Sequence, residues 1–408
     1  MTDQTELVPK RRFKGFLNSH AWEQRKLGEL GSVAMNKRIF KEQTSTAGEV
    51  PFYKIGTFGG DPDAFISRNL FEEYKAKYPY PEVGDILISA SGSIGRTVEY
   101  MGEDEYFQDS NIVWLKHDGG LDNSFLKQFY SIVKWQGLEG STIKRLYNKN
   151  ILNTNISVPS LAEQKKIGAF FKNLDNLITL HQRKLEKTKA LKAAYLSEMF
   201  PAEGESEPKR RFAGFTGAWE QRELDSIYKK IRNAFVGTAT PYYADRGNFY
   251  LQSNNVKDGQ INRTTEIFIN DEFYEKQKDK WLHTGDLVMV QSGHVGHTAV
   301  IEEELDGTAA HALIMFQEYK EQVDPYFLNF QFQTREAKRK LENKTTGNTI
   351  KHILASEMKK FEVSIPQIEE QYQIGTFFKN LDHLITLHQR KLKKLQNLKK
   401  AYLNEMFV

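Results

Sequence analysis

The sequence predicts an α/β (α+β) fold in which two similar globular domains are each followed by a long helix, with the two helices packed as an antiparallel coiled coil. First, FFKNLDNLITLHQRKL (170–185) returns as FFKNLDHLITLHQRKL (377–392) with one change in sixteen residues. Second, shorter anchors recur in the same order about 200 residues apart, which indicates a duplicated module. Third, short β-branched and aromatic runs broken by Gly and Asn precede each helix, as is typical of strands.

The repeated anchors divide the chain into five segments. AWEQRKLGEL matches AWEQRELDSI, GDILISASGSIGRT matches GDLVMVQSGHVGHT, and VPSLAEQKKIGAFF matches IPQIEEQYQIGTFF. A unit of this length is too long for a solenoid repeat. We expect the following boundaries: a globular domain at 1–159, a helix at 160–200, a linker at 201–217, a globular domain at 218–365 and a helix at 366–408.

Each globular domain is expected to contain a twisted mixed sheet. The strand signals in the first domain are DILIS, TVEY and NIVWLK, and in the second DLVMV, TAVIE and ALIMF. Helices are expected near 124–137 and 325–343.

The two long helices are nearly the same sequence. Residues 167–200 and 374–407 are identical at 26 of 34 positions. Ser160 with Glu163 three residues later predicts a capping box at the first helix. Apolar residues then recur every three to four positions, which is typical of a coiled-coil seam. The expected packing residues are Ile167, Phe171, Leu174, Ile178, Leu185, Ile374, Phe378, Leu381, Ile385 and Leu392.

Polar residues on these helices have ordinary explanations. His181 and His388 fall at equivalent seam positions, where a residue that fixes register is favoured over a metal ligand or proton switch. The Lys-rich stretch 183–192 is typical of a solvated helix face.

Composition excludes several classes of protein. The chain has no cysteine, which removes disulfides and thiol nucleophiles and fits a reducing cytoplasm. No apolar stretch is long enough to span a membrane, and no secretory signal is expected at the N-terminus. The two helices carry +7 of a total net charge of +4, so the remainder carries −3. Any nucleic-acid binding by the globular domains therefore needs a local basic patch or a partner.

The most specific local feature is a loop between two expected strands. SGSIGRT (91–97) and SGHVGHT (292–298) share the frame Ser-Gly-x-[Ile/Val]-Gly-x-Thr, and they differ at Ser93 against His294 and Arg96 against His297. A constant backbone with exchanged hydrogen-bonding side chains suits a reader of base edges. A plain strand-connecting turn explains the loop equally well.

Other polar residues complete the set of candidate DNA contacts. Lys54 and Thr57 follow the first strand of one domain, as LQSNN does in the other, and Lys144 and Lys351 end the shared Gly-[Ser/Asn]-Thr-Ile-Lys motif. The full candidate set is Lys54, Thr57, Ser91, Ser93, Arg96, Thr97, Lys144, Gln252, Ser253, Asn254, Ser292, His294, His297, Thr298 and Lys351.

Motifs for catalysis are weak or missing. No phosphate-binding loop and no dinucleotide-binding glycine pattern occurs. Asp63, Glu73 and Lys75 imitate the carboxylate–lysine pattern of metal-dependent nucleases, but the second domain has no counterpart. His294 and His297 have the spacing of metal ligands without a third ligand nearby. We therefore expect no catalytic residue and no metal site in this chain.

The duplicated order of motifs resembles the DNA-specificity (S) subunit of type I restriction–modification systems over nearly the whole chain. The motifs that carry the resemblance are WEQRKLG and WEQREL, Gly84-Asp85 and Gly285-Asp286, and [Val/Ile]-Pro-x-[Leu/Ile]-x-Glu-Gln-x-x-Ile leading into each long helix. The resemblance implies two target recognition domains, each of which reads one half of a bipartite double-stranded DNA target. It also implies that the helices set the spacer between the two halves.

The same resemblance implies the partners and cofactors. Two methyltransferase (M) subunits, which bind S-adenosylmethionine, would dock on the helices and domains, and two restriction/translocase (R) subunits would use ATP and Mg. No cofactor is expected in this chain. Two alternatives stay open: a structural adaptor with two ligand-binding modules on a coiled coil, and a nuclease built on Asp63, Glu73 and Lys75.

Overall fold

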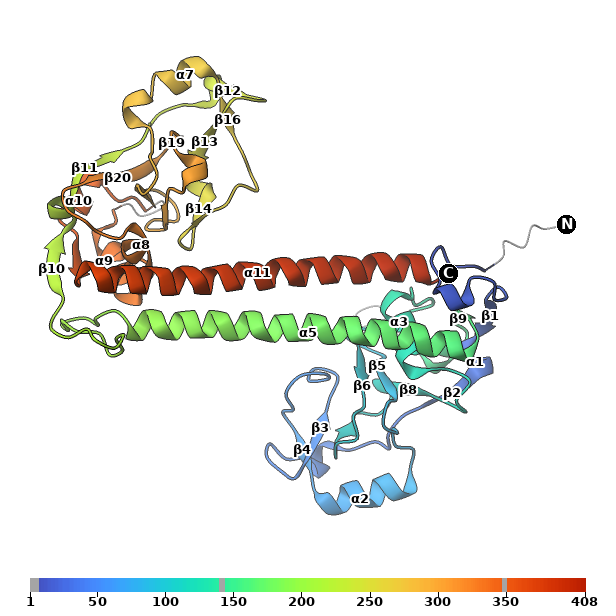
Figure 1. The fold of residues 1–408 in the computed structure, drawn as a ribbon. Helices are drawn as coiled ribbons and strands as arrows, with labels where there is room; N and C mark the ends of the chain where they lie inside the picture. The colour runs from blue at the N-terminus through green and yellow to red at the C-terminus, as the bar shows by residue number, and fades with distance from the viewer. Residues whose placement is uncertain (1–6, 139–143, 347–350) are drawn as a thin grey trace. The chain divides into compact units, whose positions relative to one another are not determined.

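The computed structural model describes residues 7–138, 144–346 and 351–408 (Figure 1). The described residues form two compact units. Unit 1 consists of the chain up to residue 182 together with residues 390–408, and unit 2 consists of residues 183–389. Each long helix therefore contributes one part to each unit.

Unit 1 is built on a four-stranded sheet in which every pairing is antiparallel, with the order β2-β8-β5-β6. All four residues of β5 are buried because both faces of the sheet are covered. Ile86 and Ile88 pack with α3 and α5, while Leu87 faces a second apolar cluster around Phe58. The strands are β2 (Gly31–Ala34), β5 (Ile86–Ser89), β6 (Thr97–Glu99) and β8 (Ile112–His117).

A second, smaller sheet in unit 1 has the order β4-β3-β7. Its β3–β7 pairing is parallel and its β3–β4 pairing is antiparallel. The mixed sheet expected from DILIS, TVEY and NIVWLK is wrong, because these strands lie in the antiparallel main sheet and only the smaller sheet is mixed. Helix α2 covers it through Phe71. These elements are β3 (Val50–Tyr53), β4 (Phe65–Ile66), β7 (Tyr106–Phe107) and α2 (Arg68–Lys77).

The start and end of the globular part of unit 1 are joined by the antiparallel pair β1–β9, and β9 leads into α5. The remaining elements of unit 1 are η1 (Lys14–Phe16), β1 (Glu23–Lys26), α1 (Leu27–Leu30), η2 (Lys41–Gln43), α3 (Asn123–Ile132), α4 (Asn148–Leu152) and β9 (Asn155–Val158).

Unit 2 repeats this plan. Its main sheet is again antiparallel, with the order β11-β20-β17-β18, and a second sheet has the order β12-β16-β13-β19, in which only β13–β19 is parallel. The strands of these sheets are β11 (Tyr228–Asn233), β12 (Tyr243–Ala244), β13 (Asn248–Gln252), β16 (Phe268–Ile269), β17 (Leu287–Val290), β18 (Thr298–Val300), β19 (Ala309–His311) and β20 (Leu313–Tyr319).

A hairpin, β14–β15, is added in unit 2, and the pair β10–β21 closes the globular part. The remaining elements are β10 (Glu220–Glu223), α6 (Leu224–Ile227), η3 (Thr240–Tyr242), η4 (Ser253–Asn255), β14 (Val256–Lys257), β15 (Gln260–Ile261), α7 (Asp271–Glu275), η5 (Lys278–Lys280), η6 (Glu303–Leu305), α8 (Pro325–Gln331), α9 (Arg335–Lys344), α10 (Ala355–Lys359) and β21 (Glu362–Ile365).

The helix expected across 325–343 is two helices, α8 and α9. Thr334 interrupts the helix because its hydroxyl accepts the backbone N–H of Ala337 and caps α9. In unit 1 the helix expected near 124–137 is α3, which is shorter and ends at Ile132.

The long helices α5 (Leu161–Glu198) and α11 (Ile368–Met406) confirm the two expected rods. Within unit 1, Phe170 packs on Tyr402, with ring centroids 5.2 Å apart, and Asp175 contacts Lys399. Within unit 2, Tyr195 packs on Phe377 at 5.1 Å and Lys192 contacts Asp382. Residue numbers rise along one helix as they fall along the other, so the pairing is antiparallel, as predicted (Figure 1).

The predicted packing residues are buried or half-buried. Ile167, Phe171 and Leu174 belong to the core of unit 1, and Ile374 and Phe378 to the core of unit 2, so the first turns of each helix pack into a globular core as well as on the other helix. Leu185 and Leu392 are buried, and Ile178, Leu381 and Ile385 are half-buried.

The capping box predicted at Ser160 is only half formed. The Ser160 hydroxyl accepts the N–H of Glu163 at 3.4 Å, but the Glu163 carboxylate accepts hydrogen bonds from Nε and Nη2 of Arg12, at 2.8 and 2.6 Å. This ion pair is buried, and it uses both oxygens of the carboxylate that a capping box would direct at the backbone N–H of Ser160. Arg211 and Glu370 form the same bidentate pair in unit 2.

The glutamine of the shared Glu-Gln motif is also structural. Gln164 accepts the N–H of Asp122 and donates to the carbonyl of Pro159, and Gln371 does the same with Asp324 and Pro366. These bonds fix the start of each long helix to the start of α3 or α8.

Candidate nucleic-acid interface

The two Gly-rich loops have the same backbone. In unit 1 the N–H of Ser89 donates to the carbonyl of Arg96, and the N–H of Gly95 returns to Ser89, both at 2.9 Å. Val290, His297 and Gly296 repeat these two bonds in unit 2 at 2.8 and 3.0 Å. The shared frame is therefore explained by a common turn between the second and third of the main strands.

The glycines of the frame are required by this turn. Gly92, Gly95, Gly293 and Gly296 all have φ between 62° and 87°, which other residues rarely adopt. A side chain at Gly95 would also lie 2.8 Å from Trp135 Nε1, and one at Gly296 would lie 2.9 Å from Leu341 Cδ1.

In unit 1 the two variable positions point to solvent. Ser93 and Arg96 are exposed, and one guanidinium nitrogen of Arg96 donates to the carbonyl of Phe58 at 2.7 Å. Thr97 is half-buried at the start of β6. Ser91 is different: it is 5% exposed and its hydroxyl donates to Asn111 Oδ1 at 2.6 Å. Ser91 is a candidate DNA contact, but in the structure its hydroxyl braces the loop.

In unit 2 the variable positions are His294 and His297. His294 is exposed, His297 has a side chain 27% exposed, and Ser292 is half-buried. Thr298 is 2% exposed and donates its hydroxyl to Asn329 Oδ1 at 2.7 Å. Thr298, also a candidate DNA contact, therefore uses its hydroxyl inside the unit as Ser91 does.

Lys144 and Lys351 lie beside the loops, as their shared motif indicates. The N–H of Leu146 donates to the carbonyl of Ala90 at 2.8 Å, and the N–H of Ile353 donates to Gln291 at 2.9 Å. Both lysines are exposed. The preceding motif residues 140–143 and 347–350 lie outside the described residues.

The residues after the first strand of the second sheet lie close to the loop in unit 1. A side chain at Gly92 would contact Ile55, which is next to Lys54, and Phe58 accepts from Arg96. Lys54 itself pairs with Asp63 at 2.8 Å, and the Thr57 hydroxyl closes a turn with the Lys54 backbone. Lys54 is half-buried and Thr57 is committed to this turn.

In unit 2 the corresponding residues form a short 3-10 turn. Gln252 donates from Nε2 to the Tyr243 hydroxyl at 2.8 Å, Ser253 is half-buried, and Asn254 is exposed. The link to the loop is made instead by Asp258, whose N–H donates to His297 Nδ1 at 3.2 Å. Sequence reasoning missed this residue, and the signal for it is the Asp-Gly pair of a hairpin turn.

His297 has an altered pKa. Burial lowers the pKa of His297, and Lys338, His294 and Lys257 act in the same direction, while Asp258 opposes them. The ring is therefore neutral near pH 7.

The Gly-Asp pairs that open β5 and β17 are structural. The Asp85 carboxylate accepts the N–H of Glu82 at 2.8 Å, and Asp286 accepts the N–H of His283 at 2.9 Å. Burial raises the pKa of both carboxyl groups. These residues shape the turn before the loop-bearing strand.

The residues that imitate a nuclease do not assemble. Asp63 pairs with Lys54, Glu73 with Lys77, and Lys75 with Asp104. Within residues 7–138, 144–346 and 351–408, no group of three or more His, Asp or Glu side chains is placed to hold a metal ion.

Lys192 corrects the interpretation of the Lys-rich stretch as a solvated face. Its ammonium lies 2.6 Å from Asp382 and 2.9 Å from Gln333, and it sits over the ring of Phe330. Leu177, Leu191 and Leu384, by contrast, are exposed on the long helices.

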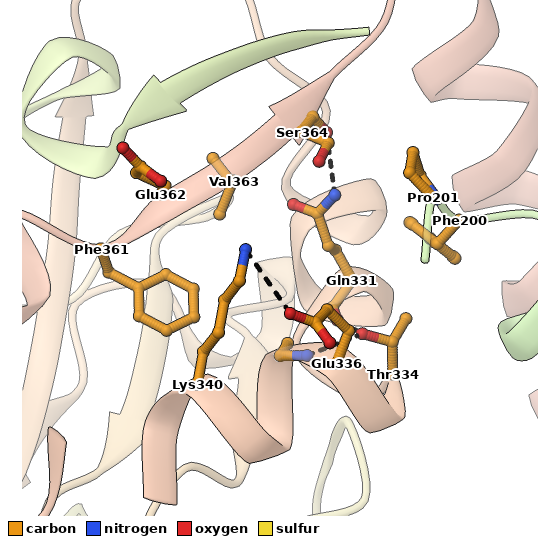
Figure 2. A pocket seen from close by; sticks show the side chains of 11 residues that line it. Phe200, Pro201, Gln331, Thr334, Glu336, Lys340, Phe361, Glu362, Val363 and Ser364 are labelled. Atoms are coloured by element: carbon orange, nitrogen blue, oxygen red, sulfur yellow. Dashed lines mark hydrogen bonds and ion pairs between the residues drawn. The ribbon is translucent and has the colours of Figure 1, made fainter. Parts of the chain in front are cut away.

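A small cavity of about 30 Å³ lies beside the Gln331 side chain in unit 2. Figure 2 shows the Gln331 amide directed at Ser364 and Lys340 directed at Glu336. Gln331 Oε1 is buried without a hydrogen-bond partner in the structure, and the volume suits one or two water molecules. This cavity is too small for a cofactor.

Comparison with known proteins identifies the family. The family model described as "Type I restriction modification DNA specificity domain" matches residues 20–190 and 217–397. A protein of Haemophilus influenzae, provisionally named a type I restriction enzyme specificity subunit, is 57% identical over 157 residues, which are 38% of this chain and 41% of that protein. The chain thus matches less than half of the length of that relative.

Two further similarities span more of the chain. The type I restriction enzyme MjaVIII specificity subunit of Methanocaldococcus jannaschii is 23% identical over 335 residues, covering 79% of this chain and 75% of that one. The crystal structure of a type I restriction–modification system S subunit from M. genitalium has a TM-score of 0.67 at 14% identity, and covers 98% of this chain and 99% of that one. This second similarity concerns the fold alone.

Among the described residues, no helix combines the length and apolar character needed to cross a membrane.

Proposed function

Because the chain belongs to the family of type I restriction modification DNA specificity domains, we propose that it is the sequence-specificity subunit of a type I restriction–modification complex. Each unit reads one half of a bipartite target on double-stranded DNA. The observation that carries this proposal is the pair of loops with one backbone and different side chains, Ser93 and Arg96 against His294 and His297. Such loops can make the same approach to DNA and select different bases.

The long helices serve two equal partners in this proposal. Their sequences are identical at 26 of 34 compared positions, and each half presents the same exposed leucine, Leu177 or Leu384. Helices with nearly the same surface give nearly the same docking site to each of two methyltransferase subunits, and the long helices set the spacer between the half-sites. Because the Gly-rich loops of the two units differ in their side chains, the two half-sites differ in sequence.

The chemistry belongs to the partners. S-adenosylmethionine would be bound by the methyltransferase subunits, and ATP and Mg by two restriction subunits. The target base is flipped into the methyltransferase, and this chain supplies no catalytic residue. The complex works on cellular DNA, which assigns the chain to the cytoplasm.

Lys144 and Lys351 are assigned to phosphate contacts, since both are exposed beside a loop. Lys54, Asn254 and Gln252 are assigned to the edge of the interface. Thr57, Ser91 and Thr298 contribute by holding the backbone in place.

The experiment is to co-express the chain with its neighbouring methyltransferase subunit and map modified adenines by single-molecule sequencing. One split motif, with two specific halves around a fixed gap, is the expected result. An assembled complex that modifies no defined motif would favour the structural adaptor. Divalent-metal-dependent cleavage by the purified chain alone would favour the nuclease.

A further inference from the structure

The loop of unit 2 holds a histidine whose hydrogen-bonding state is set by its surroundings. The backbone N–H of Asp258 points at His297 Nδ1 from 3.2 Å. A backbone N–H can only donate, so Nδ1 must be the unprotonated acceptor nitrogen of the ring. The proton of the neutral ring is therefore on Nε2.

The Asp258 N–H is fixed by a tight hairpin turn. Strands β14 and β15 pair Lys257 with Gln260, which leaves Asp258 and Gly259 as a two-residue turn. Both have positive φ, 50° and 85°, as a type I′ turn requires. A side chain at Gly259 would lie 2.2 Å from Gln333 Nε2, so this position accepts only glycine.

One buried side chain holds both sides of this contact. Asn329 is 1% exposed; it donates from Nδ2 to the Gly259 carbonyl at 2.9 Å, and its Oδ1 accepts the Thr298 hydroxyl at 2.7 Å. Gly259 adjoins Asp258, and Thr298 adjoins His297. Asn329 thus fixes the turn and the loop relative to each other.

The surrounding charges keep the ring neutral. Lys257, Lys338 and His294 face His297 and disfavour a second proton, whereas only Asp258, with Oδ1 at 3.7 Å, favours it. Burial acts with the lysines and lowers the pKa of His297. A protonated ring would also set Nδ1–H against the Asp258 N–H.

We propose that Asn329 and the Asp258–Gly259 turn hold His297 as the Nε2–H tautomer, so that unit 2 presents a hydrogen-bond donor to the DNA at this loop position. The proposal rests on the function proposed above. His297 would then select a base with an acceptor in the major groove, such as the N7 of a purine or the O4 of thymine. It would disfavour cytosine, which offers a donor there.

Unit 1 places Arg96 at the same loop position, and Arg96 is also a pure donor. At this position the two units then differ in the charge of the side chain and in the number of N–H donors, but both side chains donate hydrogen bonds. The position aligned with Asn329 is Lys127, which pairs with Glu99 at 3.2 Å, so the clamp is specific to unit 2.

The test uses two substitutions that separate the ring nitrogens. His297→Asn keeps an acceptor near Nδ1 and removes the donor at Nε2, whereas His297→Gln reaches the Nε2 position with an amide donor. In the co-expressed methyltransferase complex, H297N is expected to relax one base of one half-site by roughly 2- to 12-fold, the value of one net hydrogen bond. H297Q is expected to retain that base, and the other half-site is unchanged in both.

A ring-nitrogen measurement on the full chain tests the tautomer without DNA. Histidine labelled with ¹⁵N distinguishes protonated from unprotonated ring nitrogens, and the H297N spectrum identifies the signals of His297 among the ten histidines. An unprotonated Nδ1 is expected in the wild type, and a mixture of tautomers in Asn329→Ser. Thr298→Val, which removes one bond of the clamp, serves if Asn329→Ser does not fold.

A protonated Nδ1 in the wild type, or an unchanged tautomer in both clamp variants, overturns the fixed tautomer. A wild-type motif that H297N leaves intact overturns the base contact while the proposed function stands. A wild-type complex without any motif defeats the proposed function and the base contact together, and the ring signals still decide the tautomer.

Discussion

Lys192 on α5 lies 2.6 Å from Asp382 on α11, and the side chains are only 12% and 11% exposed. Lys399 and Asp175 repeat the contact at the same distance in unit 1. Both pairs sit where the two long helices meet a globular core. A polar pair in an apolar seam fixes which residues lie opposite one another, and here it is present once in each unit.

Asp382→Ala is expected to lower the free energy of unfolding by about 3 kcal/mol, because it leaves the Lys192 ammonium without its counter-ion in a nearly buried site. Denaturant unfolding of the full chain measures this. Lys189→Ala, on the same helix but in an exposed pair with Glu186, is the control and is expected to cost less than about 1 kcal/mol. Equal losses in the two variants would show that the Lys192–Asp382 pair is no more than a surface contact.

Arg12→Lys is expected to destabilise unit 1 nearly as much as Arg12→Ala, by about 3 kcal/mol. Arg12 binds both carboxylate oxygens of Glu163 with two nitrogens, and a lysine cannot reproduce this fork. Arg11→Lys is the neighbouring control: Arg11 pairs with Glu405 at the surface and should tolerate the change. Full stability of Arg12→Lys would mean that charge alone holds the helix start.

Gly168→Ala and Gly375→Ala are expected to destabilise the chain, although alanine favours helices by about 1 kcal/mol. A Cβ at Gly168 would lie 2.6 Å from Asp122 Oδ1, and one at Gly375 would lie 2.0 Å from Asp324 Oδ2. Those carboxylates cap α3 and α8, so they cannot move away without loss. Melting temperatures measure the balance, and a rise in either variant would contradict the close approach.

Asp286→Asn is expected to change how stability depends on pH. Burial raises the pKa of Asp286, although the N–H groups of His283 and Gln317, which donate hydrogen bonds to its carboxylate, act to lower it. The folded chain therefore binds this proton more tightly than the unfolded chain, and the penalty for the buried charge disappears as pH falls toward the ordinary value of 3.8. The wild type should gain stability relative to the variant between neutral pH and about pH 4.

Urea unfolding of both proteins across this range measures the effect. The asparagine of Asp286→Asn can still accept both hydrogen bonds, whereas Asp286→Ala removes them. Asp286→Ala should therefore lower the free energy of unfolding by about 1–3 kcal/mol more than Asp286→Asn does. Parallel pH profiles for the wild type and Asp286→Asn would contradict the raised pKa.

Arg96→Ala is expected to relax base choice in one half-site by about 1–3 kcal/mol if its guanidinium bridges a guanine. Lys144→Ala, at an exposed position beside the same loop, is expected to weaken binding evenly across sequences and to reduce its salt dependence. Methylation mapping of each variant in the complex separates the two results. An even loss in Arg96→Ala would reduce Arg96 to a phosphate contact.

The parts of the fold that were predictable from sequence are those with strong local patterns. The first three residues of β5 and the first four of β8 are uninterrupted apolar runs, and the long helices carry a clear periodicity. The second sheets were missed because β4, β7, β12 and β16 have two residues each, too few to show alternation. The break at Thr334 depends on a side-chain cap inside an otherwise helical run.

The two Gly-rich loops of the candidate site were predictable from sequence, but the residues that hold these loops in place were not. Glycine spacing and the exchange of Arg96 for His297 mark the loop directly. The burial of Ser91 and Thr298 depends on Asn111 and Asn329, which lie 20 and 31 residues away along the chain. The role of Lys192 likewise needs Asp382, and only the fold brings such residues together.

The two Gly-rich loops share one backbone and differ in their side chains, so a mutation can change a side chain without changing the backbone. A change in the codon for Arg96 or His297 alters what one half of the chain presents, and leaves the glycines, the Glu-Gln tethers and the helices unchanged. Under the proposed function, the base preference of one half-site can therefore change while the helices that are proposed to bind the partner subunits stay the same.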